Sequence, residues 1–139
     1  MNTIIPEIFF YLFLQILALL FYSPAWAVKS NCDNKKIKLH KKADQLIQRI
    51  EEVEFCARPA AKFRDKVFSN LKYRSNRLKT CVQMVKQENL GFDCSREFRK
   101  TMKADGGENC AKQIQVMKNL FKKFEILLPG YEDCLKNKD

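Results

Sequence analysis

Residues 108–128, ENCAKQIQVMKNLFKKFEILL, decide the fold because they carry the most regular apolar pattern in the chain. Apolar side chains recur in steps of four, three, four, three and four residues, which is the period of one face of an α-helix. The positions in this stripe are Cys110, Ile114, Met117, Phe121, Phe124 and Leu128. Pro129-Gly130 comes next and predicts that the helix ends there.

The same period predicts a first helix over Asn34–Cys56. Its stripe consists of Leu39, Ala43, Leu46, Ile50, Val53 and, just beyond, Ala57. A proline, Pro59, then prevents the helix from continuing. This segment and the one at residues 108–128 are the two elements that the sequence defines best.

The segment from Pro59 to Leu90 contains no glycine and no further proline. Its apolar residues form two stripes with a polar run between them: first Ala60, Phe63, Val67, Phe68 and Leu71, then Leu78, Cys81, Val82 and Val85. The segment is therefore either one long helix or two helices joined near Asn70–Asn76. The pattern slightly favours the single helix.

A short helix is expected around Cys94, Phe98 and Met102, with Gly91 ending the helix before it and Asp93 as its N-cap. Asp105-Gly106-Gly107 predicts the turn that follows. No stretch of useful length alternates in the manner of a strand. The sequence therefore predicts an all-α fold, a small disulfide-stapled antiparallel bundle of four or five helices.

The six cysteines are interpreted as structural disulfides: Cys32, Cys56, Cys81, Cys94, Cys110 and Cys134. None has the spacing of a zinc or thioredoxin-like site, and we expect neither a metal nor a cofactor. Cys32 and Cys56 bracket one predicted helix, so they lie some 30 Å apart, whereas a disulfide requires Cα atoms within about 7 Å. Cys110 and Cys134 are excluded from pairing in the same way. If Pro59–Leu90 is one long helix, Cys56 and Cys110 lie at the same end of the bundle, and Cys56–Cys110 is then the favoured pairing.

The N-terminal segment has the features of an export signal. Met1–Tyr22 lacks lysine and arginine, Ile8–Tyr22 is apolar except for Gln15, and Pro24-Ala25-Trp26-Ala27 resembles a signal-peptidase site. We expect residues 1–27 to be a signal peptide and residues 28–139 to be a single secreted domain, without a transmembrane segment after cleavage. An uncleaved anchor is the alternative, because basic residues follow the apolar run and none precedes it.

The formal net charge of +10 makes the basic surface the main functional candidate. Three clusters are expected: Lys35, Lys36, Lys38, Lys41 and Lys42; Lys72, Arg74, Arg77 and Lys79; and Arg96, Arg99, Lys100 and Lys103. The first helix carries lysines near its expected start and glutamates near its end, against its macrodipole. Either a neighbouring helix compensates these charges or a negative partner binds them.

Outside the cell, the candidate partners are sulfated glycans, anionic lipid headgroups and acidic protein surfaces. Solubility explains the charge equally well. No nucleic-acid motif is present, so we expect no nucleic acid as a partner.

The leading functional hypothesis is a secreted binding module, a ligand or effector that acts on an extracellular partner. We expect no enzyme, because His40 has only lysines as neighbours and the acidic pairs lie in charged, solvated stretches. One alternative is a cationic membrane-active or antimicrobial protein, based on the amphipathic segment Val116–Phe124. Another is a carrier of small apolar ligands, in a cavity lined by Phe63, Phe68, Phe98, Phe121 and Phe124.

Cysteine spacing separates the chain from the insect odorant-binding proteins, whose gaps between the second and third and between the fifth and sixth cysteines are much shorter. The last third, Cys110 followed by Tyr131-Glu132-Asp133-Cys134-Leu135, resembles cysteine-rich helical domains of unknown function in secreted nematode proteins. The resemblance implies a secreted domain without a catalytic motif.

Overall fold

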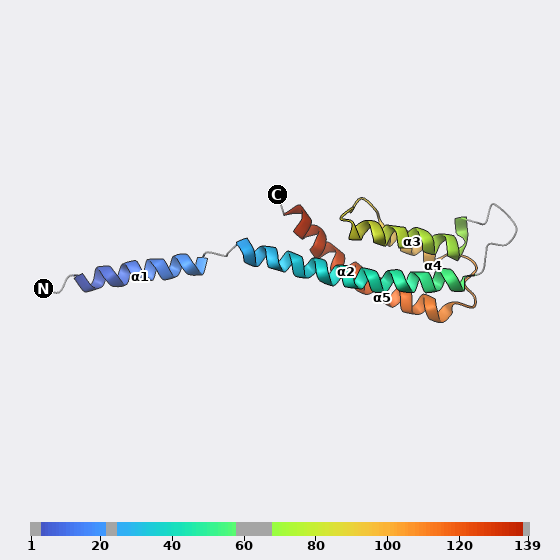
Figure 1. Cartoon of the computed structure of the whole chain (residues 1–139), viewed down its shortest axis with the longest axis horizontal. Coiled ribbons are helices and arrows are strands. Elements are labelled where there is room, and N and C mark those ends of the chain that lie inside the picture. Colours follow the sequence, from blue (N-terminus) through green and yellow to red (C-terminus); the bar gives the residue numbers. More distant parts are fainter. Residues whose placement is uncertain (1–3, 22–24, 58–67, 138–139) are drawn as a thin grey trace. The chain divides into compact units, whose positions relative to one another are not determined.

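The computed structural model describes residues 4–21, 25–57 and 68–137. The chain divides into two units, Met1–Asp33 and Asn34–Asp139. The helices in chain order are α1 (Ile4–Phe21), α2 (Ala25–Cys56), α3 (Leu71–Lys86), α4 (Cys94–Met102) and α5 (Ala111–Lys136) (Figure 1). No strand occurs in the described ranges, and the all-α prediction is confirmed.

The first unit consists of α1 and the beginning of α2. Large apolar side chains of α1 are exposed, among them Phe9, Tyr11 and Phe21. Across the described residues, no helix combines the length and the apolar character needed to span a bilayer.

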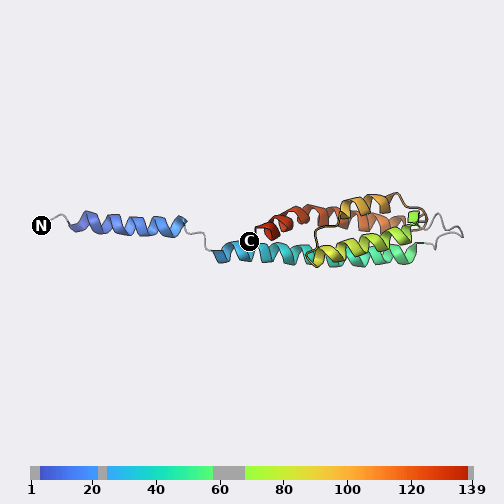
Figure 2. The ribbon, with the colours of Figure 1, turned by 90° about the horizontal axis from the view of Figure 1, so that it is seen from above.

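In the second unit α2 and α5 lie side by side and antiparallel (Figures 1 and 2). At one end Cys56, the last residue of α2, is bonded to Cys110, which precedes α5. Towards the other end, the side chain of Lys35 of α2 lies beside Gly130 of α5, within 4 Å of the position that a Cβ atom would occupy there. This register brings the middle of each helix opposite the middle of the other.

The core is built from the stripes that the sequence defines. Six positions of the first stripe, from Leu39 to Ala57, are at most 5% exposed. They pack with Leu71, Leu78, Val82 and Val85 of α3 and with Met117, Phe121, Phe124 and Tyr131 of α5. Phe98 of α4 closes the core by stacking on Phe121, with ring centroids 4.0 Å apart.

The disulfides link the helices to one another. Cys56–Cys110 joins α2 to the start of α5, as predicted, and Cys81–Cys94 joins α3 to the start of α4. Cys32 and Cys134 are disulfide-bonded as well, and no cysteine is free. Both excluded pairings are absent, because Cys56 and Cys110 bind each other.

The preference for one helix from Pro59 to Leu90 is wrong, because α3 begins only at Leu71. The side chain of Asn70 caps α3 by accepting a hydrogen bond from the backbone N–H of Lys72 at 2.9 Å. Asn70 has an extended backbone, with φ of −73° and ψ of 140°. The Leu71 N–H donates to the carbonyl oxygen of Asp105 at 2.7 Å and holds the chain at this point. Phe68 is 61% exposed instead of lying in a stripe, and residues 58–67 of this segment lie outside the described residues.

The predicted end of the last helix at Pro129-Gly130 is also wrong, because α5 continues through Pro129 to Lys136. Proline removes a backbone donor and its ring crowds the preceding turn, which disfavours a helix interior by about 3 kcal/mol. The turn beyond it is retained because Tyr131 is 1% exposed in the core and Cys134 is disulfide-bonded. Tertiary contacts therefore outweigh the local preference.

The end of α3 also differs from expectation. Gln87 is the C-cap of α3, and Glu88, not Gly91, has the left-handed backbone, with φ of 63°. Asp93 is the N-cap of α4, as predicted, and accepts a hydrogen bond from the Arg96 N–H at 2.9 Å. Further along, Gly106 has a φ of 93° in the predicted turn.

Candidate functional site

The first predicted basic cluster does not form one patch, because the helical period of α2 sends its members to different sides. Lys36 pairs with Glu88, whose carboxylate lies 2.9 Å from the lysine Nζ. Lys35 and Lys42 lie towards α5, the former beside Gly130. Lys41 is exposed on the side of α2 away from the core. The cluster is thus divided between a structural pair and a surface that faces α5, to which helical spacing also assigns Lys38.

The second cluster is partly used within the fold. Lys79 of α3 binds Glu54 of α2 at 2.9 Å and lies 4.0 Å from Glu51. The guanidinium of Arg74 lies over the ring of Tyr73, 5.5 Å from its centroid. The remaining members, Lys72 and Arg77, are exposed.

Ion pairs between α2 and α3 compensate part of the charge of α2, chiefly at its glutamate-rich end. Besides Lys79–Glu54, Lys86 of α3 binds Asp44 of α2. The lysines of α2 also oppose the macrodipole less than the sequence suggests. Because α2 begins at Ala25, Lys35 lies well beyond the first turn, where the effect of the dipole fades.

The third cluster lies on α4 and at its C-cap, Lys103. Arg96, Arg99 and Lys103 are exposed, and Lys100 is half-buried. They surround a helix of only 9 residues whose apolar side packs inward through Phe98. The cluster thus exists as a local basic surface, separate from the α5-facing side of α2.

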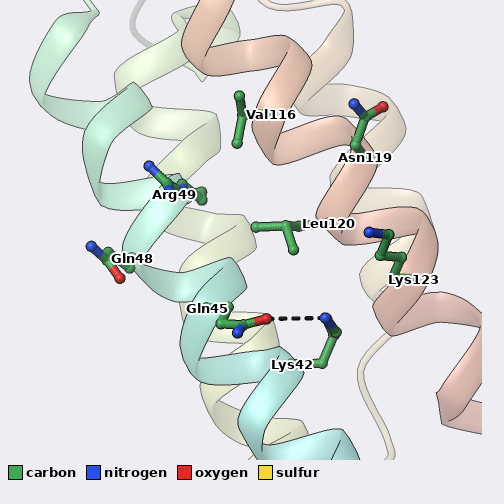
Figure 3. Close-up of a pocket in the computed structure, with 8 residues that line it drawn as sticks. All are labelled: Lys42, Gln45, Gln48, Arg49, Val116, Asn119, Leu120 and Lys123. Atoms are coloured by element: carbon green, nitrogen blue, oxygen red, sulfur yellow. Dashed lines mark hydrogen bonds between the residues drawn. The ribbon is translucent and has the colours of Figure 1, made fainter.

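A groove between α2 and α5 has the most distinctive surface chemistry of the second unit (Figure 3). Its volume is about 510 Å³, and we call it the α2–α5 groove. It is lined by Lys42, Gln45, Gln48, Arg49, Val116, Asn119, Leu120 and Lys123. Three cations, three amides and two aliphatic side chains thus meet in one depression.

Within the α2–α5 groove, Lys42 donates a hydrogen bond to the Gln45 side chain at 3.0 Å. Arg49 is bound to Glu52 by two contacts of 2.8 and 2.9 Å, which partly neutralise it. Lys42 and Lys123 lie on facing helices and form no ion pair with a carboxylate in the described part of the chain. Positive charge is therefore concentrated at the end of the groove where these two lysines lie.

Sequence reasoning missed Arg49 and Lys123 as members of this site. A signal was present, because Lys42 and Arg49 are seven residues apart, as are Val116 and Lys123. Residues at this spacing return to the same side of a helix. Recognising that these two sides face each other required the register of α2 against α5, which the sequence does not contain.

A second groove shares Gln48 with the first and has the opposite charge. Its volume is about 580 Å³, and it is lined by Gln48, Glu51, Glu52, Phe55, Cys56 and Gln113. Phe55 is 94% exposed, an unusual position for a large aromatic side chain. The surface along α2 therefore changes from basic to acidic and apolar.

His40 is half-buried, whereas the sequence suggests a surface position. Its ring meets that of Tyr131 edge-on, and its Nε2 has no hydrogen-bond partner within the described structure. Burial lowers the pKa of His40, and the positive charges of Lys36 and Lys86 lower it further. The neutral form is therefore favoured, and His40 serves the packing of α2 against α5.

The residues of the two alternative functions are used mainly in packing. Phe121 and Phe124 are buried in the core, Phe98 stacks on Phe121, and Phe68 is exposed, while Phe63 lies outside the described residues. In the segment Val116–Phe124, Met117, Phe121 and Phe124 face the core. Of these phenylalanines, those within the described residues line neither of the grooves described above.

Comparison with known proteins adds no assignment. No family model, no curated protein and no solved structure matches this chain. Among the described residues, no group of three histidine, cysteine or acidic side chains is placed to hold a metal ion. The chemistry of the surface is therefore the available guide to function.

Proposed function

We propose that this chain is exported, loses residues 1–27, and acts outside the cell as a disulfide-stapled helical module that binds a sulfated glycan. The leader sequence and the complete use of the cysteines in disulfides support export, since disulfides persist in oxidising compartments. The binding surface is the α2–α5 groove together with Lys35 and Lys38, which continue its basic side along α2.

One observation carries the glycan assignment. Where α2 and α3 pack together, the lysines are paired with carboxylates. In contrast, four cations on the α5 side have no such pair in the described part of the chain: Lys35, Lys38, Lys42 and Lys123. These unpaired cations are held on two rigid helices beside amide side chains that can donate to sulfate oxygens. Fixed positive charges along an open groove suit a linear polyanion.

Heparin chromatography of the oxidised protein tests this proposal. Full-length precursor is expressed in secretory cells, and the product in the medium is analysed for its N-terminus and applied to the column. Retention above physiological salt is expected, because the cations would contact the polyanion at distances shorter than the Debye length of about 8 Å, so screening leaves much of the attraction. The triple variant Lys38→Glu, Lys42→Glu and Lys123→Glu should elute in the flow-through.

The matched control has the same charge change on α4: Arg96→Glu, Arg99→Glu and Lys103→Glu. If net charge alone governs retention, both variants lose it equally, and the assignment to the α2–α5 groove fails. If the unmodified protein passes through the column at physiological salt, the glycan proposal fails altogether. Absence of the protein from the medium would contradict export.

A further inference from the structure

The side of α2 that faces away from the core carries an unusual combination of residues. We call it the outer face of α2; it comprises Ile37, Lys41, Asp44, Gln48, Glu51 and Phe55. Positions 37 and 55 are separated by five full helical turns and therefore point in the same direction. Ile37 is 65% and Phe55 94% exposed, so both ends of this face present a large apolar side chain to solvent.

Between Ile37 and Phe55, the outer face of α2 carries a positive charge near one end and a negative charge near the other. Lys41 is one turn from Ile37, and Glu51 is one turn from Phe55. Asp44 lies between Lys41 and Glu51 and is bound to Lys86 of α3. Lys41 and Glu51 are about 15 Å apart along the helix, too far to neutralise each other. Lys41 has no ion pair in the described part of the chain, and the Glu51 side chain is 57% exposed with its closest cation, Lys79, at 4.0 Å.

This arrangement is self-complementary under a twofold axis. If a second copy lies antiparallel with the axis beside Leu46, Ile37 of each copy meets Phe55 of the other. In the same register Lys41 of each copy meets Glu51 of the other. A parallel arrangement would instead place lysine beside lysine and glutamate beside glutamate.

We propose that the outer face of α2 is a homodimer interface, in which two copies of this chain pack antiparallel through α2. A twofold axis repeats each contact, so the dimer contains two Ile37–Phe55 contacts and two Lys41–Glu51 ion pairs. A single helix face on each side makes a small interface, so the dimer is weak and reversible. This inference goes beyond the proposed glycan binding and does not depend on it, since Lys41 and Glu51 do not line the basic end of the α2–α5 groove.

Sedimentation equilibrium of the oxidised protein without any glycan tests the proposal. The weight-average mass should rise from monomer towards dimer as the concentration increases, and less so in high salt. Lys41→Glu and Glu51→Lys should each raise the dimer dissociation constant about tenfold, because each places two like charges together. The swapped double variant, Lys41→Glu with Glu51→Lys, should return to near the original value.

Two controls make the result specific. Lys103→Glu changes the net charge as much as Lys41→Glu but lies at the C-cap of α4, away from the outer face of α2, and it should leave the dissociation constant unchanged. Phe55→Ser should weaken association while leaving the unfolding midpoint unchanged, since its side chain is almost fully exposed. A monomer at all concentrations up to the sub-millimolar range overturns the proposal, as does a swapped double variant that stays as weak as either single variant.

Discussion

The ion pair between Glu54 and Lys79 should stabilise the fold by about 1–2 kcal/mol, more than an ordinary surface pair. The carboxylate and the ammonium lie 2.9 Å apart, and the two side chains are only 21% and 19% exposed. At an effective dielectric constant of about 20, this separation gives an attraction of about 6 kcal/mol, most of which desolvation offsets. The net value therefore lies between that of exposed pairs, about 0.2–1 kcal/mol, and that of fully buried ones.

A double-mutant cycle measures this interaction by urea unfolding at pH 7, with Glu54→Gln, Lys79→Met and the double variant. Lys79→Met alone should cost more than Glu54→Gln alone. The lysine variant leaves Glu54 uncompensated in the last turn of α2, where an anion is disfavoured, whereas the glutamate variant removes that anion. The coupling energy is free of this difference, because each single effect cancels in the cycle.

The pH dependence gives an independent check. Burial alone would raise the pKa of Glu54, but hydrogen bonds from Lys79 and Asn76 and the positive charge of Lys79 lower it overall from 4.5. A carboxylate with a lowered pKa in the folded state stabilises the protein above the pKa of the unfolded state. The coupling should therefore be fully present above about pH 5 and decline as the pH falls below 4.5.

The exposed pair Arg49–Glu52 serves as the control, since its side chains are 41% and 39% exposed. Its coupling energy should not exceed about 0.5 kcal/mol. A Glu54–Lys79 coupling as small as this control, or one that persists unchanged at pH 3, would refute the reasoning from burial.

Three further predictions concern positions where the core leaves little freedom. Ser75→Ala should be neutral or stabilise the fold by up to about 1 kcal/mol in urea unfolding. The reason is that the Oγ of this fully buried residue has no hydrogen-bond partner in the described structure. A loss of stability greater than about 1 kcal/mol would mean that the hydroxyl does have a partner. Gly107→Ala should destabilise by about 1–3 kcal/mol, since the new Cβ would lie 2.7 Å from Cδ2 of Leu71. Gly91→Ala, with 3.5 Å of room and an ordinary backbone, should change stability little, and equal effects at the two glycines would contradict the steric argument. The free energy of unfolding should fall as the pH drops below 6.5, because the pKa of His40 is lowered in the fold and the unfolded chain binds the proton more readily. His40→Gln should remove this contribution and flatten the profile of stability against pH between about pH 7.5 and 5.

Local patterns in the sequence predict the helices that form the core and the staple that joins two of them. The stripe from Leu39 to Ala57 is buried at every position. Helix length excludes two pairings, and Cys56–Cys110 forms as favoured, although the single helix over Pro59–Leu90 on which that preference rests does not form. The errors occur where a single long-range contact decides the local structure. Leu71 begins a new helix because its N–H donates to Asp105, and no local property of the segment contains that partner.

The candidate site was less predictable for a related physical reason. Sequence proximity groups Lys35, Lys36 and Lys41 into one cluster, but successive residues of a helix point in directions about 100° apart. Each lysine therefore meets a different environment: α5, α3 or solvent. The site that the fold assembles combines α2 with Lys123, which is distant in sequence and close only through the register of α2 against α5.

The contrast between the two sides of α2 argues against solubility as the sole reason for its basic character. A surface selected only for solubility requires charged side chains but not a particular arrangement of them. The α3-facing and α5-facing sides of α2 would then carry a similar mixture of positive and negative residues. On the α3 side, cations are matched with carboxylates: Lys36 with Glu88, and Asp44 and Glu54 with lysines of α3. On the α5 side, Lys42 meets Lys123 across the groove without a carboxylate between them. Like charges held on facing helices repel and reduce stability. The anion binding proposed above would offset that repulsion and so account for lysines on both sides of the groove.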